Sequence, residues 1–134
     1  MPLSAFVIVG AISLSIALLE AWILVAQFSS AAMQRLVPGR ADLVRSHIDY
    51  LLMTLFLFAF YGLARTTGAA IPAWAIAAAC LGALFNPFGF LVYAVRPDFR
   101  EAPPKAFFAM ITTSCVATTV GYAVTAWTIA FAAM

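Results

Sequence analysis

Three ionisable residues stand inside long apolar stretches of this sequence: Glu20, His47 and Asp49. A charged group in the interior of a bilayer is costly, so such residues are functional candidates by default. His47 is the only histidine, and imidazole is a common ligand of haem iron and other metals. One histidine per chain excludes a two-histidine electron-transfer site within a single subunit and leaves a five-coordinate iron with an open position.

The neighbours of His47 support two interpretations. Arg45 and Asp49 are four residues apart and can pair on one face of a helix, whereas Tyr50 and Thr54 align with His47 on another. In the first interpretation, His47 is an interfacial histidine that bonds lipid or water beside an Arg45–Asp49 ion pair. In the second, His47 binds haem iron and Arg45 pairs with a haem propionate. Tyr50 and Thr54 would then line a substrate pocket.

A second polar position lies further along the chain. Asn86 stands beside Pro87 in an apolar stretch, and Tyr93 follows two turns later on roughly the same face. An asparagine in hydrocarbon usually bonds a neighbouring helix or a carbonyl freed by proline. Its amide can also hold a polar substrate group in a pocket lined by aromatic rings such as Phe90. We therefore take Asn86 and Tyr93 as candidate catalytic residues and Phe90 as a pocket residue.

Composition places all these residues in membrane helices. Of the 134 residues, 66% are hydrophobic and 9% are charged, with a mean hydropathy of +1.06. A soluble domain is about half apolar and a quarter charged, so a cytosolic enzyme and a nucleic-acid binder are excluded. Since a membrane span needs about 20 apolar residues, we predict one all-α integral-membrane domain over 1–134, a four-transmembrane-helix bundle with helices over 3–33, 41–64, 72–95 and 106–131.

Two features of the later helices bear on the site. Pro87 removes a backbone donor within the helix over 72–95, so it is expected to bend or open the helix and free a carbonyl near Ala83. The helix over 106–131 is rich in small residues, which let membrane helices approach closely. Because a bundle this small encloses little volume, a deep site is expected to be shared between subunits of a homo-oligomer, a dimer or trimer, or open to lipid.

Basic residues predict the orientation. By the positive-inside rule, the two loops with the excess of Lys and Arg are cytoplasmic and both termini lie outside. A multi-pass protein of the bacterial inner membrane fits this pattern. A cleaved signal peptide competes for the first stretch, but no Lys or Arg precedes it and Glu20 interrupts it. Six basic residues flank the two loops and one lies on the other side: Arg35, Arg40, Arg45, Arg96, Arg100 and Lys105, against Arg65.

The sequence also resembles a known family. The run Arg45-Ser46-His47, the later run Asn86-Pro87-Phe88-Gly89-Phe90 and a connector containing Pro97 look like those of the small four-helix styrene oxide isomerases and the related hydroxylaminobenzene mutases. This resemblance covers the second to fourth helices. It departs after the histidine, where Ile48-Asp49-Tyr50 follow and Met53-Thr54 stand in place of an Asn-Gly pair. Tyr93 lies close to, but not at, the family's tyrosine.

The resemblance implies a cofactor and a reaction. The family binds haem b between subunits of a homo-oligomer, with His47 as the expected axial ligand and ferric iron as a Lewis acid. A small hydrophobic, aryl epoxide would be rearranged to an aldehyde without net redox change, which makes the protein an isomerase. A hydroxylaminobenzene mutase-type rearrangement is the alternative reaction.

Other classes of function remain open. Four helices and an acid in Leu18-Leu19-Glu20-Ala21 faintly resemble the small multidrug-resistance exporters, in which Glu20 would exchange protons for a cationic drug. The run Ser46-His47-Ile48-Asp49-Tyr50 is similar to fragments of the cytochrome b anchor subunits of respiratory complexes. A structural or assembly role is the remaining possibility. Cys80 and Cys115 are expected to be packing residues rather than a disulfide or redox pair.

Overall fold

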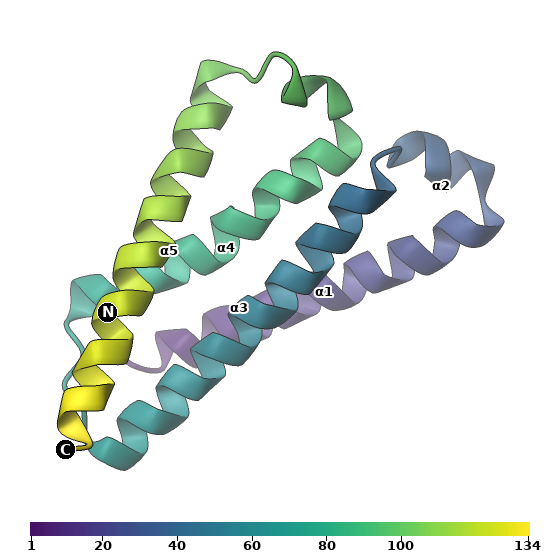
Figure 1. Cartoon of the computed structure of the whole chain (residues 1–134). Coiled ribbons are helices and arrows are strands. Elements are labelled where there is room, and N and C mark those ends of the chain that lie inside the picture. The colour runs from purple at the N-terminus through teal and green to yellow at the C-terminus, as the bar shows by residue number, and fades with distance from the viewer.

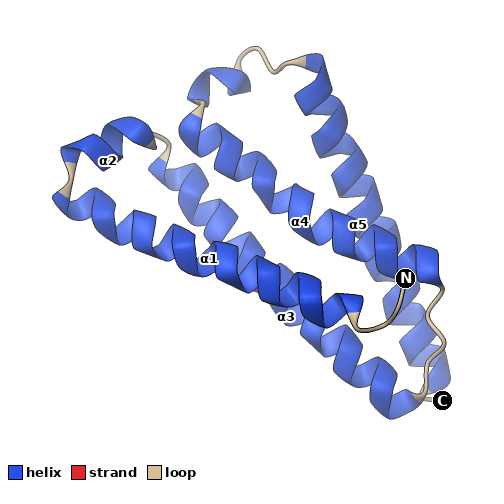
Figure 2. Cartoon of the chain, turned by 180° about the vertical axis from the view of Figure 1, so that it is seen from behind, coloured by secondary structure: helices blue, strands red, loops and turns tan.

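The computed structural model describes residues 1–134, and every element in it is a helix (Figures 1 and 2). Four of the helices, α1, α3, α4 and α5, are long and apolar enough to cross a membrane. The predicted all-α four-helix bundle is therefore confirmed, and the chain is a multi-pass membrane protein by the length and composition of its helices. The elements are α1 (Ala5–Ser29), α2 (Ala31–Leu36), α3 (Arg40–Thr67), α4 (Ala73–Val95), the 3-10 helix η1 (Pro97–Arg100) and α5 (Lys105–Ala132).

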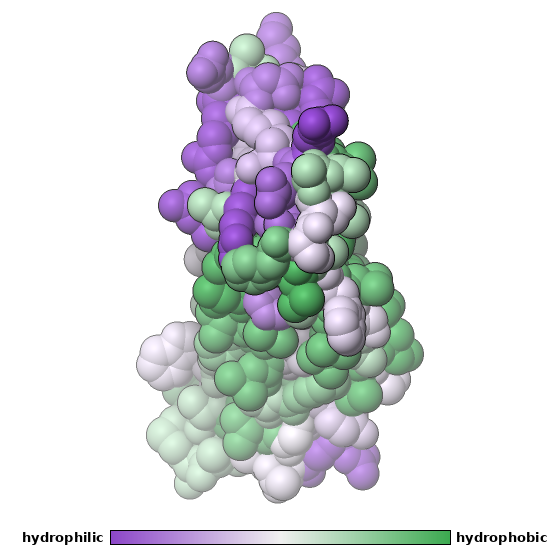
Figure 3. Space-filling model, turned by 90° about the vertical axis from the view of Figure 1, so that its right-hand side faces the viewer, coloured by the Kyte–Doolittle hydropathy of each residue, from purple (hydrophilic) through white to green (hydrophobic).

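The long helices form two hairpins, α1 with α3 and α4 with α5, joined where α3 packs against α4. Figure 1 shows both chain termini at one end of the bundle, and α2 and η1 at the other. Hydrophilic residues gather at the end with α2 and η1, above a broad hydrophobic band (Figure 3). The six basic residues of the two predicted cytoplasmic loops thus share one end of the molecule, while Arg65 lies near the opposite end of α3.

The first predicted helix is wrong as a single element. We expected one helix over 3–33, but α1 ends at Ser29 and α2 begins at Ala31. Ser30 between them has extended backbone, and its hydroxyl accepts a hydrogen bond from the Met33 amide at 3.2 Å, which caps α2. The Gln27 amide then donates to the carbonyl of Val37 at 2.7 Å and secures the return of the chain towards α3.

The other helix boundaries lie within three residues of the prediction. The largest difference is at the end of α3, which we expected at residue 64 and which continues to Thr67. The hydroxyls of Thr66 and Thr67 donate to the carbonyl of Leu63, so these residues extend the last turn instead of leaving it. Gly68 then ends the helix with a φ of 71°, a left-handed conformation that glycine adopts without strain.

Small residues set the spacing of α4 and α5. A Cβ atom added at Gly82 would lie 2.6 Å from the Cα atom of Thr118, and one added at Gly121 would lie 2.8 Å from the Cα atom of Ala79. The two backbones therefore approach each other closely at both glycines, as the small-residue pattern predicts. Much of α5 remains on the outside of the bundle, and few of its residues are buried.

Candidate functional site

A buried polar cluster lies where α1, α3 and α4 meet. Glu20 of α1 is 2% exposed, and its Oε1 atom accepts a hydrogen bond from the hydroxyl of Ser46 at 2.6 Å. The Ser46 hydroxyl also lies 3.2 Å from the carbonyl oxygen of Pro87 in α4. The second carboxyl oxygen of Glu20, Oε2, has no hydrogen-bond partner. Three helices thus converge on a single hydroxyl group.

The neighbouring His47 faces α1. Its Nδ1 atom lies 2.9 Å from the carbonyl oxygen of Ala17, and the side chain is half-buried. A carbonyl can only accept a hydrogen bond, so Nδ1 carries the proton and donates it. In the neutral ring the lone pair then resides on Nε2, which is the atom left to bind a metal ion or another ligand.

The predicted Arg45–Asp49 pair is absent. Arg45 instead lies 3.3 Å from Asp42, which is one turn earlier on α3. Asp42 is buried and is also paired with Arg100 of η1, whose Nε atom donates to its Oδ2 at 3.3 Å. Two guanidinium groups therefore converge on Asp42, and Arg45 pairs with this residue instead of with Asp49. Asp49 remains half-buried without an ion-pair partner.

Tyr50 and Thr54 are core residues. Tyr50 is 1% exposed, and its hydroxyl donates to the carbonyl of Leu84 at 2.9 Å. This carbonyl is adjacent to the one at Ala83 that we expected Pro87 to free, so the proline region does attract a donor from another helix. The Thr54 hydroxyl lies 3.2 Å from the carbonyl of Gly10 and 2.9 Å from that of Tyr50. Neither hydroxyl is left to meet a substrate.

The other candidate residues do come together. Asn86, Phe90 and Tyr93 line one cavity of about 110 Å³ between α4 and α5, together with Cys115. The Cys115 thiol donates to Oδ1 of Asn86 at 3.1 Å, so the amide NH₂ of Asn86 remains a free donor. His47 does not line this cavity. Within one subunit the structure therefore separates the predicted metal ligand from the predicted catalytic residues.

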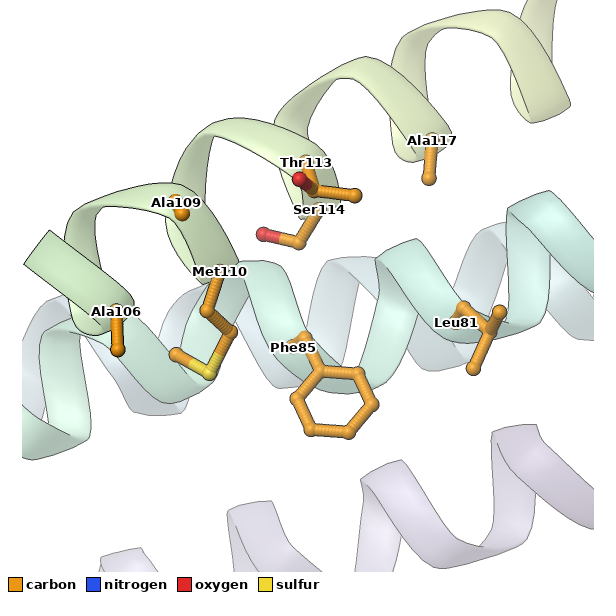
Figure 4. Close-up of a pocket in the computed structure, with 8 residues that line it drawn as sticks. All are labelled: Leu81, Phe85, Ala106, Ala109, Met110, Thr113, Ser114 and Ala117. Atoms are coloured by element: carbon orange, nitrogen blue, oxygen red, sulfur yellow. The ribbon is translucent and has the colours of Figure 1, made fainter.

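The α4–α5 hairpin also carries a larger apolar groove of about 410 Å³ (Figure 4). Figure 4 shows that Phe85 and Leu81 project from α4 below a row of small α5 side chains. Thr113 and Ser114 supply its only polar side chains. Most of the residues that line the groove are exposed on the surface of the helix pair, so the groove is open to an apolar molecule from outside.

Outside the membrane helices, the α4–α5 connector contains an ion pair of its own, between Arg96 and Asp98. Arg96 forms two hydrogen bonds to the Asp98 carboxylate, at 3.1 Å and 2.9 Å. This guanidinium lowers the pKa of Asp98 below its ordinary value. No group of three or more His, Cys, Asp or Glu side chains comes together anywhere in the chain.

The sequence analysis overlooked Ser46 and Asp42. Ser46 lies between Arg45 and His47, and nothing in its spacing marks it as a partner of Glu20, which stands on another helix. Asp42 stands in the first turn of α3, where an acidic residue is ordinary because it faces the positive end of the helix dipole. Its role as the partner of Arg100 depends on how the two hairpins meet.

No protein-family model, curated protein or solved structure matches this chain. The fold and the site therefore define its class: a small multi-pass membrane protein with an oriented histidine and a buried acid among its helices.

Proposed function

We propose that this chain is the subunit of an integral-membrane isomerase, in the bacterial inner membrane, that holds haem b through His47 and converts a small hydrophobic, aryl epoxide to an aldehyde. The observation that carries the proposal is the 2.9 Å contact between His47 Nδ1 and the Ala17 carbonyl oxygen. A histidine that binds a metal usually donates its other ring N–H to such a group, which fixes the tautomer and the ring orientation. The half-buried His47 thus has the chemistry of an axial ligand.

Two further features of the chain support a haem site. When bound, haem supplies a ferric iron that acts as a Lewis acid. His47 would hold it, and each chain supplies this one histidine. Arg45 would pair with a propionate, because its side chain is 58% exposed although it also contacts Asp42.

Asn86, Phe90 and Tyr93 would bind the substrate. The free NH₂ of Asn86 can donate to a polar oxygen, while the two aromatic rings contact an aryl group. Their cavity of about 110 Å³ is smaller than ordinary ligand pockets of about 300–1,000 Å³. The small volume favours a small substrate and a site that a second subunit completes. We therefore infer a homo-oligomer in which the histidine of one copy faces the α4–α5 hairpin of the next. An aryl hydroxylamine is the alternative substrate.

The test is the visible absorption spectrum of the purified protein, oxidised and reduced with dithionite. We expect a haem Soret band in the wild type and its loss in His47→Ala. The matched control is His47→Gln, which keeps a side-chain donor for the Ala17 carbonyl but has no imidazole, so it should fold and lose the band. A wild-type protein that stays colourless after haem is added would exclude the proposal.

One observation favours a second function, proton-coupled export. Glu20 is 2% exposed and its Oε2 atom has no partner, as expected of an acid that gains and loses a proton inside a transporter. In proteoliposomes with an acidic lumen, wild-type protein would then exchange internal protons for an external lipophilic cation, and Glu20→Gln would abolish this uptake. Equal uptake by both proteins would exclude Glu20 as the coupling residue.

A further inference from the structure

The hydrogen bonds around Ser46 cannot all form at once. Ser46 is fully buried, and its hydroxyl lies 2.6 Å from Glu20 Oε1 and 3.2 Å from the carbonyl oxygen of Pro87. A serine hydroxyl has one proton, so it donates one hydrogen bond at a time. Both neighbours are pure acceptors when Glu20 is ionised. The carboxylate is the nearer and stronger acceptor, so the Pro87 carbonyl then loses the hydrogen bond from Ser46.

A proton on Glu20 resolves this conflict. The carboxylic acid becomes a donor to the Ser46 oxygen, and the Ser46 hydroxyl is released to donate to the Pro87 carbonyl. A continuous chain of two hydrogen bonds then runs from α1 through α3 to α4. The proton also removes a charge from a side chain that is 2% exposed and has no cation beside it.

We propose that Glu20 and Ser46 form a proton-binding site among the membrane helices, and that the bound proton links α4 at Pro87 to α1 and α3. The position of the link matters because Pro87 has no backbone N–H, so the carbonyl of Ala83, one turn earlier in α4, receives no hydrogen bond from it. The bond from Ser46 reaches α4 at this same proline, where the helix has one hydrogen bond fewer to resist bending. Loss of the proton loosens α4 at this point.

Few other ionisable groups face this site. The nearest on α3 are His47 and Tyr50, and each is already bonded to a backbone carbonyl, His47 to Ala17 and Tyr50 to Leu84. Asp49 follows on the same helix and is half-buried. Glu20 is the only charged residue of α1, and α4 has none. Glu20 forms an ion pair with none of these groups, so a proton on its own carboxyl group is the direct way to neutralise it.

The link has a consequence for the cavity on α4. Asn86 precedes Pro87 directly, and Phe90 and Tyr93 occupy the next two turns. Movement of α4 at Pro87 would therefore shift the residues that line this cavity. Glu20 acts here as a positioning residue, since it touches none of them and works through Ser46.

Infrared spectroscopy tests the proton directly. In the purified full-length protein at neutral pH, the wild-type spectrum minus that of Glu20→Gln should contain the C=O stretching band of a protonated carboxylic acid. The other four acidic residues are present in both proteins and cancel. Ser46→Ala should shift the band to higher frequency, because a hydrogen bond is lost. The absence of a band at every pH at which the protein stays folded would overturn the proposal.

Hydrogen–deuterium exchange tests the link. The comparison is made at matched pH, above the pH at which Glu20 loses its proton. Amides of α4 after Pro87 should then exchange about fivefold faster in wild type than in Glu20→Gln, because a fivefold change corresponds to the loss of one ordinary hydrogen bond. The two proteins should agree while the acid is protonated, because glutamine also donates. Ser46→Ala should exchange fast under both conditions, and Ser46→Cys replaces it if the alanine variant does not fold.

Ser13→Ala is the matched control, because it removes a fully buried serine hydroxyl that has no hydrogen-bond partner. It should follow the wild type throughout. Identical exchange in wild type and Glu20→Gln at every pH would exclude the link even if the proton band is present. Neither measurement requires haem or an epoxide, so its result is independent of the proposed isomerase. A Glu20 that never binds a proton would also exclude it as the coupling residue of an exporter, whereas a proton band without transport would exclude the exporter alone.

Discussion

Asp42 and Arg100 join the beginning of α3 to the connector between α4 and α5, although 58 positions separate them in the sequence. Asp42 accepts from Nε of Arg100 at 3.3 Å and from its Nη2, and the Asp42 side chain is only 9% exposed. Arg45 contacts the same carboxylate. This cluster holds together the ends of the two hairpins at the pole where the basic residues gather.

Replacing Asp42 with asparagine should destabilise the protein. The change removes the charge from hydrogen bonds that are each worth about 1.5–3 kcal/mol when one partner is ionised. We expect a lower Tm in detergent, measured by thermal unfolding. The control is Asp98→Asn, which breaks the ion pair of Arg96 and Asp98, two exposed side chains, and should leave Tm unchanged within error. Equal effects of the two variants would show that the Asp42 cluster adds nothing.

Glycine contacts should set the packing of α4 on α5. Because a Cβ atom at Gly82 or Gly121 would meet backbone atoms of the facing helix, Gly82→Ala or Gly121→Ala should cost about 1–3 kcal/mol of stability through overpacking. Gly62→Ala is the control, since nothing lies within 4 Å of its added Cβ atom. That variant should be unchanged or up to about 1 kcal/mol more stable. Thermal unfolding that ranks Gly62→Ala with the other two would refute this packing.

The sequence predicted the helices well because a span needs a long apolar run, and such runs are visible without any knowledge of neighbours. It missed the break at Ser30 because the apolar residues resume directly after the Ser29-Ser30 pair and Ser30 acts only through a cap to Met33. At Thr66 and Thr67 the sequence led to the opposite error, a turn where the helix continues. Their hydroxyls donate to the Leu63 carbonyl and prolong the helix.

The pairing of side chains across helices was harder to predict. Arg45 has acidic residues one turn away on both sides, Asp42 and Asp49, and helix geometry alone allows either pair. The arrival of Arg100 at Asp42 organises the cluster there, and this depends on how one hairpin is rotated against the other. The same holds for Ser46 and Glu20, whose contact requires the register of α1 against α3.

Asn86 offers a test of the proposed substrate site that leaves haem binding intact. Under the isomerase proposal, Asn86→Ala removes a hydrogen-bond donor to the substrate oxygen and should lower kcat/KM about tenfold to a hundredfold, with the visible spectrum unchanged. Cys115→Ser is the control, because serine can still donate to Oδ1 of Asn86. Its activity should stay close to that of the wild type. Full activity in Asn86→Ala would remove this residue from the site.

The orientation in the membrane can be measured with reporter fusions. The structure places both termini at the end opposite α2 and η1, and the positive-inside rule assigns the end with six basic residues to the cytoplasm. Alkaline phosphatase, which is active only outside, should therefore be active when fused after Met134 and inactive when fused after Pro103. Green fluorescent protein, which fluoresces in the cytoplasm, should give the reverse pattern. Arg65→Gln should not alter either result, because the charge of Arg65 lies on the outer side and opposes the predicted orientation. A reversed pattern in the wild type would refute the assignment.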